Sequence, residues 1–261
     1  MQTPYEKIRE LTKNLPVTPP RHWERLGDVI ILRMEKSEYE DEIGAIYAKV
    51  LRARTVVVEE RIEGIKRKPR VRKICGDGTE TIARENGIIY KLDVSRVMFS
   101  SGNEKERFRM GRIVKEGEKV LDMFAGIGYF SIPMGKIASV WACELNEDAF
   151  HYLNENIELN RSDVRASLGD NRVTVPDLEI EFQRVVMGYL RDTHEFLPTA
   201  LNALDDGGII HYHEATKNSH DVIKRVNRVC RENGREIKKI GVNRIKSIAP
   251  GVVHHVFDLF F

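Results

Sequence analysis

Cysteine is scarce in this chain of 261 residues, which contains three, far apart at Cys75, Cys143 and Cys230. Because no CxxC spacing occurs, the sequence fits neither a disulfide framework nor a cysteine-based zinc site, and a reducing compartment is expected. Glutamine is rarer still. It occurs only at Gln2 and Gln183 while Glu, Lys and Arg are abundant, a bias seen in proteins of hot environments.

Long apolar runs are also missing. None approaches the roughly 20 residues that a helix needs to cross a bilayer, and residues 1–15 carry charges throughout, unlike a signal peptide. With 41% hydrophobic and 31% charged residues, the chain can bury a core and is not disordered as a whole. We expect a folded cytoplasmic protein with no membrane contact and no obligate protein partner.

The charges of the chain are unevenly distributed. Up to Ile113 there are 24 Lys and Arg against 18 Asp and Glu, whereas the remainder has 18 against 22. Much of the excess lies in residues 61–73, RIEGIKRKPRVRK, with seven cations and one acid. A basic front half favours a polyanionic partner, although a charge run of this kind is also typical of a solvated hairpin.

The front half predicts a small α+β unit. Prolines after residue 15 end an amphipathic first helix, in which Tyr5 is one of the apolar residues. The predicted elements are a helix over 3–15, a strand over 28–34, a helix over 35–51, a strand over 55–60, a basic hairpin over 61–74, and strands over 81–83 and 88–92.

Beyond Gly111 short apolar strands alternate with helical stretches. This alternation predicts an α/β domain with a parallel, doubly wound, Rossmann-like sheet and an antiparallel last strand. The predicted strands cover 119–123, 139–144, 164–168, 184–187, 208–213, 236–243 and 252–260. The sequence thus divides into an N-terminal arm (1–27), a small α+β domain (28–98) and a Rossmann-like domain (99–261).

The strongest motif is KVLDMFAGIGYFSIPMG over residues 119–135. A buried strand ends at Asp122, Gly126 and Gly128 form a tight turn, and Tyr129 is predicted to open a helix. Glycines let the backbone approach a ligand, and a helix N-terminus offers unpaired amides. Asp122 is a candidate acceptor for a ligand ammonium group.

Two further strand ends supply polar side chains. Glu144 closes WACE, where an acid can accept both hydroxyls of an adenosine ribose. Asp170 and Asn171 follow the third strand, where they can hydrogen-bond an adenine edge. Because the carboxyl ends of parallel strands meet at one edge, the sequence predicts a nucleoside site there.

A dinucleotide site is the competing interpretation, but its GxGxxG fingerprint has Ser131 at the third position here. DMFAGIGYFS followed by ELN resembles instead the class I S-adenosylmethionine-dependent transferases. The resemblance implies S-adenosyl-L-methionine as co-substrate. Asp122, Phe124, Gly126 and Gly188 join the predicted cofactor site.

A narrower resemblance rests on residues 99–113, FSSGNEKERFRMGRI. This segment is similar to one in the tRNA guanine-37 N1-methyltransferases and the related archaeal-type aminocarboxypropyltransferases of wybutosine synthesis. The resemblance implies that Ser100 and Arg107 contact the cofactor. It also places Glu106 where the methylating branch has an acid implicated in proton handling, which makes Glu106 the candidate catalytic base.

The fourth strand separates these two branches. Guanine methyltransferases usually carry Asn-Pro-Pro or Asn-Leu-Pro there, whereas this chain has MGYL over residues 187–190, similar to the aminocarboxypropyltransferase branch. The resemblance implies transfer of a 3-amino-3-carboxypropyl group to C7 of 4-demethylwyosine in the anticodon loop of tRNA(Phe), with release of 5′-methylthioadenosine. A tRNA guanine-37 N1-methyltransferase and a non-catalytic tRNA-binding module are the alternatives.

Several remaining residues allow two interpretations. Arg21, His22 and Trp23 offer an RNA stacking surface, or Trp23 only holds the N-terminal arm in place. His211 and His213 share one strand face and could bind a metal, but no third ligand follows from the sequence and no metal is expected. His254 and His255 are interpreted as surface or packing residues, and four tyrosines as core residues: Tyr5, Tyr39, Tyr47 and Tyr152.

Overall fold

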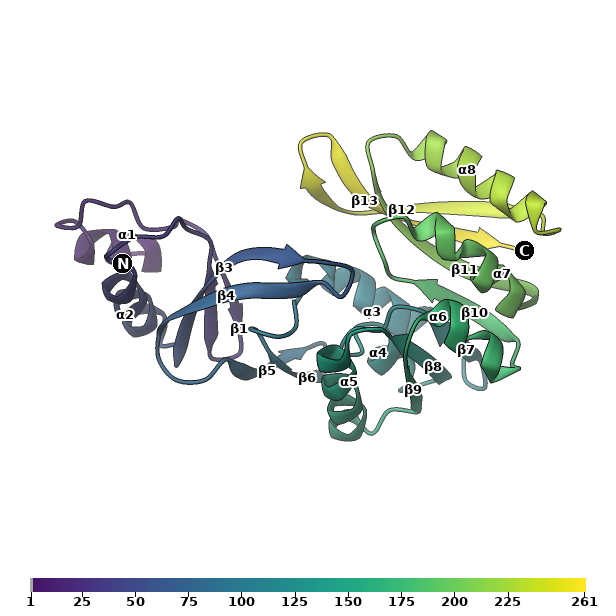
Figure 1. Ribbon diagram of the computed structural model, residues 1–261, viewed down its shortest axis with the longest axis horizontal. Coiled ribbons are helices and arrows are strands. Elements are labelled where there is room, and N and C mark those ends of the chain that lie inside the picture. The colour runs from purple at the N-terminus through teal and green to yellow at the C-terminus, as the bar shows by residue number, and fades with distance from the viewer. Residues whose placement is uncertain (1) are drawn as a thin grey trace. The chain divides into compact units, whose positions relative to one another are not determined.

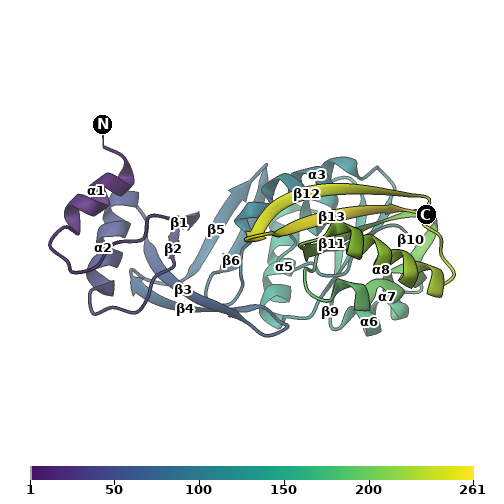
Figure 2. The same cartoon turned by 90° about the horizontal axis from the view of Figure 1, so that it is seen from above.

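The computed structural model describes residues 2–261 and divides the chain into two compact units, the second of which begins at Gly102. Figure 1 and Figure 2 show the elements from two directions. Each unit has its own sheet and its own buried core. Among residues 2–261, no helix combines the length and the apolar composition that crossing a bilayer requires.

The first unit contains a four-stranded mixed sheet, two helices and a separate hairpin. Its elements are α1 (Pro4–Leu11), β1 (Trp23–Leu26), β2 (Val29–Leu32), α2 (Glu40–Leu51), β3 (Thr55–Glu63), β4 (Lys68–Cys75), β5 (Glu80–Glu85) and β6 (Ile88–Asp93). The strand order is β1–β2–β3–β4, with only β2 and β3 parallel, and β5 pairs with β6. Ile8 of α1 is fully buried in the same core as Ile30 and Tyr47. The predicted α+β character of this half is confirmed.

Helix α1 is shorter than the predicted helix over 3–15. Thr3 caps its start by accepting from the Glu6 amide, and Pro4 occupies the first turn. Thr12 ends it, because its hydroxyl bonds the Ile8 carbonyl and turns follow. Two of the tyrosines predicted as core residues, Tyr5 and Tyr39, are only partly buried, whereas Tyr47 and Tyr152 are buried.

The second unit is built on a seven-stranded sheet. Its elements are α3 (Glu104–Ile113), β7 (Lys119–Asp122), α4 (Ser131–Met134), β8 (Ser139–Glu144), α5 (Glu147–Asn160), β9 (Val164–Leu168), α6 (Asn171–Thr174), β10 (Phe182–Met187), α7 (Leu197–Ala203), β11 (Leu204–Thr216), α8 (Ser219–Glu232), β12 (Lys239–Ala249) and β13 (Val252–Phe260), with short 3₁₀ turns η1 (Ser101–Asn103), η2 (Pro176–Leu178) and η3 (Thr193–Phe196). The order is β12–β13–β11–β10–β7–β8–β9, and β13 runs antiparallel to both of its neighbours. The predicted Rossmann-like sheet with an antiparallel last strand is confirmed.

Helices cover both faces of this sheet, as Figure 2 shows for α3 on one side and α7 and α8 on the other. Alternation along the strands supplies both cores. Val120 and Val186 join the core that contains Met110 of α3, whereas Leu121 and Val185 join the core that contains residues of α7 and α8. Consecutive apolar residues in each strand therefore bury the sheet on both faces.

The helix after the glycine turn differs from the prediction. It begins at Ser131 rather than Tyr129 and has only four residues. Residues 126–130 form turns, in which the amides of Gly128 and Tyr129 both donate to the Ala125 carbonyl. Since these amides have partners within the chain, the helix N-terminus offers fewer free donors than the motif indicated.

Candidate functional site

Three consecutive parallel strands bring the predicted acidic residues to one edge of the large sheet. Asp122 ends β7, Glu144 ends β8, and Asp170 follows β9 after Gly169. The strands are in register, with Asp122 opposite Ala142 and Glu144 opposite Leu168. The carboxyl ends of neighbouring parallel strands are where α/β proteins bind ligands, so this edge is the candidate site.

The turn after β7 requires its glycines. Gly126 has a φ of 58° and Gly128 a φ of 97°, both in the left-handed region. A Cβ on Gly128 would lie 2.4 Å from Cγ1 of Ile132, and one on Gly126 would lie 2.7 Å from the ring of Tyr129. The backbone is therefore packed too closely for a side chain at either position.

Glu144 holds this turn in place. Its Oε2 accepts from the Gly126 amide and its Oε1 from the Asn146 amide, each at 2.7 Å. Burial raises the pKa of Glu144 and these backbone bonds oppose the shift. Each carboxylate oxygen still has a lone pair for a further donor, such as a ribose hydroxyl.

Asn171 has an unused acceptor at the same edge. Its Nδ2 donates to the Met123 carbonyl at 2.8 Å, but its buried Oδ1 has no hydrogen-bond partner among residues 2–261. A buried acceptor without a donor is costly, and an adenine amino group has the chemistry to satisfy it. Asp170 instead caps α6 and pairs with Arg172 at 2.6 Å, and this hydrogen bond lowers the pKa of Asp170.

Asp122 lies beneath the surface of the site. It is fully buried, its Oδ2 accepts from the Ser131 hydroxyl at 2.6 Å, and its Oδ1 accepts from the Phe124 amide at 3.2 Å. Burial raises the pKa of Asp122 to about 6 against the effect of these bonds. Both oxygens therefore brace the turn from within the chain.

Aromatic side chains flank the ends of β7 and β10. The ring of Phe124 stacks on Tyr189 with centroids 5.1 Å apart and meets Phe196 edge-on at 5.0 Å. A Cβ on Gly188 would lie 2.9 Å from the Phe130 ring. Phe124 and Gly188, both predicted in the cofactor site, thus lie beside the glycine turn in an apolar setting that suits a flat ring.

Three residues predicted for the site precede β7, and the structure does not bring all of them to the glycine turn. Arg107 of α3 is buried, with its guanidinium 5.7 Å from the centroid of the Tyr129 ring, so the structure brings it to the glycine turn. Glu106 is buried too, but both of its carboxylate oxygens accept from Arg109, at 2.7 and 2.8 Å. Ser100 belongs to the first unit and is not grouped with either.

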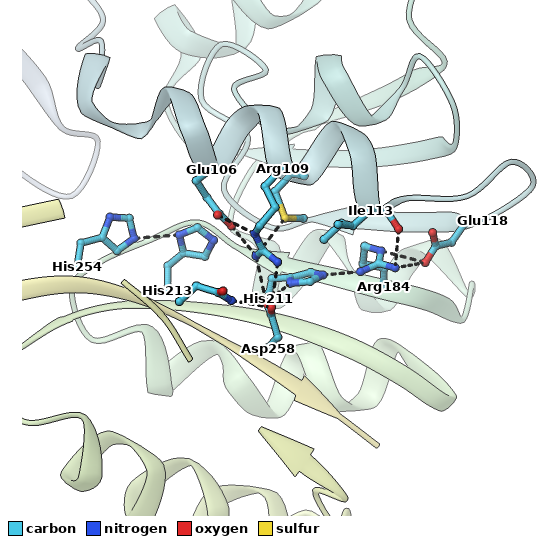
Figure 3. Close-up of polar contacts among 11 residues, drawn as sticks. Glu106, Arg109, Ile113, Glu118, Arg184, His211, His213, His254 and Asp258 are labelled. Atoms are coloured by element: carbon cyan, nitrogen blue, oxygen red, sulfur yellow. Dashed lines mark hydrogen bonds and ion pairs between the residues drawn. The ribbon is translucent and has the colours of Figure 1, made fainter. Parts of the chain in front are cut away.

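Glu106 belongs to a chain of buried charges under α3, shown in Figure 3. Arg109 also donates to Asp258 of β13 at 2.9 and 3.1 Å. Asp258 in turn contacts Nδ1 of His211 at 2.5 Å, and Nε2 of His211 contacts Arg184 at 2.5 Å. Arg184 completes the chain by pairing with Glu118. These residues tie α3 to three strands of the sheet.

The pKa values follow from burial and pairing in this chain of charges. Burial raises the pKa of Glu106, and Arg109 offsets this only in part. Burial also acts to raise the pKa of Asp258, but the bonds from His211 and Arg109 outweigh it and bring that pKa down to about 2. Burial lowers the pKa of His211 despite Asp258. Asp258 is therefore the ionised anchor of the group.

The metal interpretation of His211 and His213 finds no further ligand. Residues 2–261 contain no group of three or more His, Cys, Asp or Glu arranged to hold a metal ion. Both ring nitrogens of His211 already have partners, Asp258 and Arg184. A metal on His211 would have to displace one of them.

At least three of the seven cations of the basic hairpin are paired with acids. Arg61 pairs with Glu63 on the same strand, Arg70 and Arg72 of β4 pair with Glu60 of β3, and Arg72 also pairs with Glu40 of α2. The expected excess of positive charge there is reduced accordingly.

A pocket of about 610 Å³ in the first unit presents further cations. Arg21 and His22 on its wall have no side-chain partner among the described residues, whereas Arg33 pairs with Glu59. Trp23 meets Tyr47 edge-on at 5.9 Å, so its ring is held against the core as well as lining the pocket. The lining residues are Pro20, Arg21, His22, Trp23, Glu24, Arg25, Ile31, Arg33 and Ser101.

Sequence reasoning missed Arg109, Arg184 and Asp258. A signal was present, since FQRVVM and VFDLF each carry one charge inside an apolar strand. A charge in such a position requires a buried partner. The identity of that partner is a tertiary fact, because Arg109 and Asp258 lie 149 residues apart.

Two family models match the chain, and together they span most of it. The model described as the TRM5/TYW2 methyltransferase domain matches residues 81–238, and that of the TYW2 N-terminal domain matches residues 7–79. A tRNA(Phe) (4-demethylwyosine(37)-C(7)) aminocarboxypropyltransferase from Pyrococcus horikoshii is 42% identical, over 96% of this chain and 93% of the relative. The enzyme of that name from Methanocaldococcus jannaschii is also 42% identical, over 92% and 97%.

Methylating relatives are more distant. A tRNA (guanine(37)-N(1))-methyltransferase Trm5b from Pyrococcus abyssi is 35% identical over 94% of this chain and 76% of its own length. Among solved structures, P. horikoshii TYW2 in complex with MeSAdo has a TM-score of 0.83 and 38% identity, covering 97% of each chain. M. jannaschii TYW2 in complex with AdoMet has a TM-score of 0.74 and 37% identity, covering 92% of this chain and 99% of that one.

Proposed function

The chain belongs to the TRM5/TYW2 methyltransferase domain family, and from this we infer that it is an aminocarboxypropyltransferase of tRNA. The proposed reaction moves the 3-amino-3-carboxypropyl group of S-adenosyl-L-methionine to C7 of 4-demethylwyosine at position 37 of tRNA(Phe), releasing 5′-methylthioadenosine. The observation that carries this choice is the 42% identity, over nearly whole chains, to two relatives of that name. MGYL at the end of β10 agrees, since it lacks the asparagine typical of guanine methylation.

We assign the cofactor site to the edge described above. Glu144 binds the ribose hydroxyls, Asp170 and Asn171 bind the adenine edge, and Phe124 with Gly188 borders the ring. Asp122 and Gly126 shape the turn, and Arg107 and Ser100 contact the remainder. The unused Oδ1 of Asn171 and the glycine turn support this assignment. Glu106 stays a proposed base, held by Arg109. We also propose that the chain divides into an N-terminal arm (1–27), a small α+β domain (28–98) and a Rossmann-like domain (99–261). Its proposed location is the cytoplasm, in common with tRNA.

The chemistry depends on positioning. S-adenosylmethionine supplies a sulfonium with three electrophilic carbons, and the carbon held in line with the nucleophile is the one that is transferred. The chain's residues therefore act mainly by holding the methionine part in one orientation. Gly188, just after β10, lets the Phe130 ring pack against the backbone, since a Cβ there would lie 2.9 Å from that ring.

A label-transfer assay tests the proposed function. One batch of S-adenosylmethionine carries its label in the methyl group and another in the methionine carboxyl carbon. Each is incubated with tRNA(Phe) that has either guanine or 4-demethylwyosine at position 37. We expect only the carboxyl label to enter tRNA, and only the tRNA with the tricyclic base.

Other results of this assay would replace the proposal. Methyl label entering tRNA with plain guanine would identify a guanine-37 N1-methyltransferase. No label in either tRNA, with tRNA binding retained, would identify a binding module.

The pocket of the first unit predicts a phosphate contact. Because Arg21 has no acidic partner among the described residues, Arg21→Ala should reduce the slope of log affinity for tRNA against log salt concentration by about 1. Arg61→Ala is the matched control, since Arg61 is neutralised by Glu63. Filter binding between 50 and 200 mM salt measures both variants. Equal slopes for the two would exclude Arg21 as a phosphate ligand.

A further inference from the structure

Two histidines form a buried pair beside the candidate site. His213 of β11 and His254 of β13 are almost completely inaccessible, and Nδ1 of His213 lies 3.1 Å from Nε2 of His254. The remaining nitrogens, Nε2 of His213 and Nδ1 of His254, are buried with no hydrogen-bond partner among residues 2–261. Figure 3 shows the two rings facing each other at the end of the buried charges.

The two histidines of this pair can adopt two tautomeric arrangements, whereas His211 can adopt only one. His211 is restricted to one tautomer, because Asp258 requires a proton on Nδ1 and Arg184 requires a lone pair on Nε2. In the His213–His254 pair either ring can donate to the other. In both arrangements, one of the two outer nitrogens, Nε2 of His213 or Nδ1 of His254, carries a proton and the other carries a lone pair. One arrangement becomes the other when Nε2 of His213 takes up a proton, the bridging proton moves across the 3.1 Å contact to Nε2 of His254, and Nδ1 of His254 releases its proton. The pair can therefore accept a proton at one end and release one at the other.

The surroundings keep both rings neutral. Burial lowers the pKa of His213 well below its usual value, and the neighbouring His254, His211 and Arg109 lower it further, against Asp258. Burial lowers the pKa of His254 to about 4, with Lys246 and His255 acting in the same direction. Neutral rings are the form in which one histidine can pass a proton to the next.

The pair also has a defined position relative to the candidate site. His213 follows Tyr212, which is opposite Met187, the residue before Gly188. Its ring lies 5.2 Å from that of Phe130, which packs against Gly188. His254 is one strand further out, opposite Lys246 of β12. Of the two, His213 is therefore the histidine nearer the end of β10, and His254 is the one nearer the edge strand β12.

We propose that His213 and His254 form a relay that carries the proton displaced from the acceptor carbon out to the sheet edge. This rests on the proposed function. In that reaction a bond forms between the acceptor C7 and the γ-carbon of the methionine chain, and the bond from that γ-carbon to sulfur breaks. C7 then loses its proton, which Nε2 of His213 takes up in place of Glu106, whose two carboxylate oxygens both accept from Arg109, while Nδ1 of His254 releases another.

Proton removal from C7 is the measurement that tests the relay. Single-turnover transfer is compared for tRNA carrying hydrogen or deuterium at C7, using wild type, His213→Gln and His254→Gln. Both variants should transfer on the order of 100-fold more slowly. The C7 deuterium isotope effect should rise in both, because proton removal becomes the slow step. Affinity for S-adenosylmethionine should stay at the wild-type value. His220→Gln, an exposed histidine at the start of α8, is the matched control.

The ring nitrogens of the folded wild-type protein give a test that needs no variant. Nitrogen-15 spectra at neutral pH should show His211 in a single tautomer and both His213 and His254 as averages of two. Single fixed tautomers for the pair would overturn the relay, as would a slower rate with an unchanged isotope effect. Wild-type protein that transfers no carboxyl label would refute the proposed function itself, whereas normal transfer by both variants would refute the relay alone.

Discussion

Replacing Glu144 with alanine is expected to weaken binding of S-adenosylmethionine by about 100-fold. Glu144→Ala removes two acceptor oxygens proposed for the ribose hydroxyls, and a hydrogen bond to a charged group contributes about 1.5 kcal/mol or more. It also removes the acceptor for the Gly126 amide, which holds the glycine turn. Isothermal titration of the cofactor measures the loss.

The matched control for this change is Glu158→Ala, which removes an exposed acid from the helix that follows the same strand. Glu144→Ala should leave tRNA affinity within about twofold of wild type, because none of the proposed phosphate contacts involves β8. Cofactor affinity equal to wild type in a folded Glu144→Ala protein would remove Glu144 from the site. A parallel loss of tRNA affinity would indicate a general defect in folding.

Replacing Asp258 with asparagine is expected to lower the free energy of unfolding by about 3 kcal/mol at neutral pH. Asp258 accepts from Arg109, His211 and Asn243, and the neutral amide leaves the partly buried Arg109 with Glu106 as its remaining counter-charge. Urea denaturation monitored by circular dichroism measures the change. Asp177→Asn, on an exposed turn, is the control and should be within about 0.5 kcal/mol of wild type.

The same substitution should change how stability depends on pH. The pKa of Asp258 is lowered to about 2 in the folded state, from a usual value near 3.8. A carboxyl with a lowered pKa stabilises the fold above pH 4 and loses that contribution as the pH falls towards 2. The shift corresponds to about 2 kcal/mol. Wild type should lose this amount between pH 4 and 2, and Asp258→Asn should not. Parallel curves for the two proteins would contradict the pairing.

Most of the candidate site at the edge of the large sheet could be predicted from the pattern of apolar strands. Apolar runs that end in Asp122, Glu144 and Asp170 place these residues at one edge once the strands are parallel and adjacent, and the alternation of strands and helices already indicates that topology. The glycine turn could be predicted too, since a φ near 60° or 100° favours glycine. The start of the helix that follows the turn could not be predicted. It depends on which amides the turn uses internally.

For the basic hairpin, by contrast, the charge pairing could not be predicted from the sequence. Its seven cations predict a phosphate-binding surface, but cross-strand register decides which acids lie beside them. Arg72 reaches Glu40 on α2 as well as Glu60 on β3, and neither pairing follows from residue spacing. Arg21 is less conspicuous in the sequence, yet it lines a pocket and has no acidic partner among the described residues.

The sequence by itself determined the α/β class, the strand ends of the candidate site and the family, because these depend on local periodicity and on short motifs. Tertiary structure alone decided which charges are neutralised and which are exposed, that Glu106 is held by Arg109, and that His213 meets His254. The physical reason is the sequence separation over which each kind of interaction acts. Hydrophobic alternation acts between near neighbours in the chain, whereas buried charges and ring nitrogens take their partners from strands far apart in sequence.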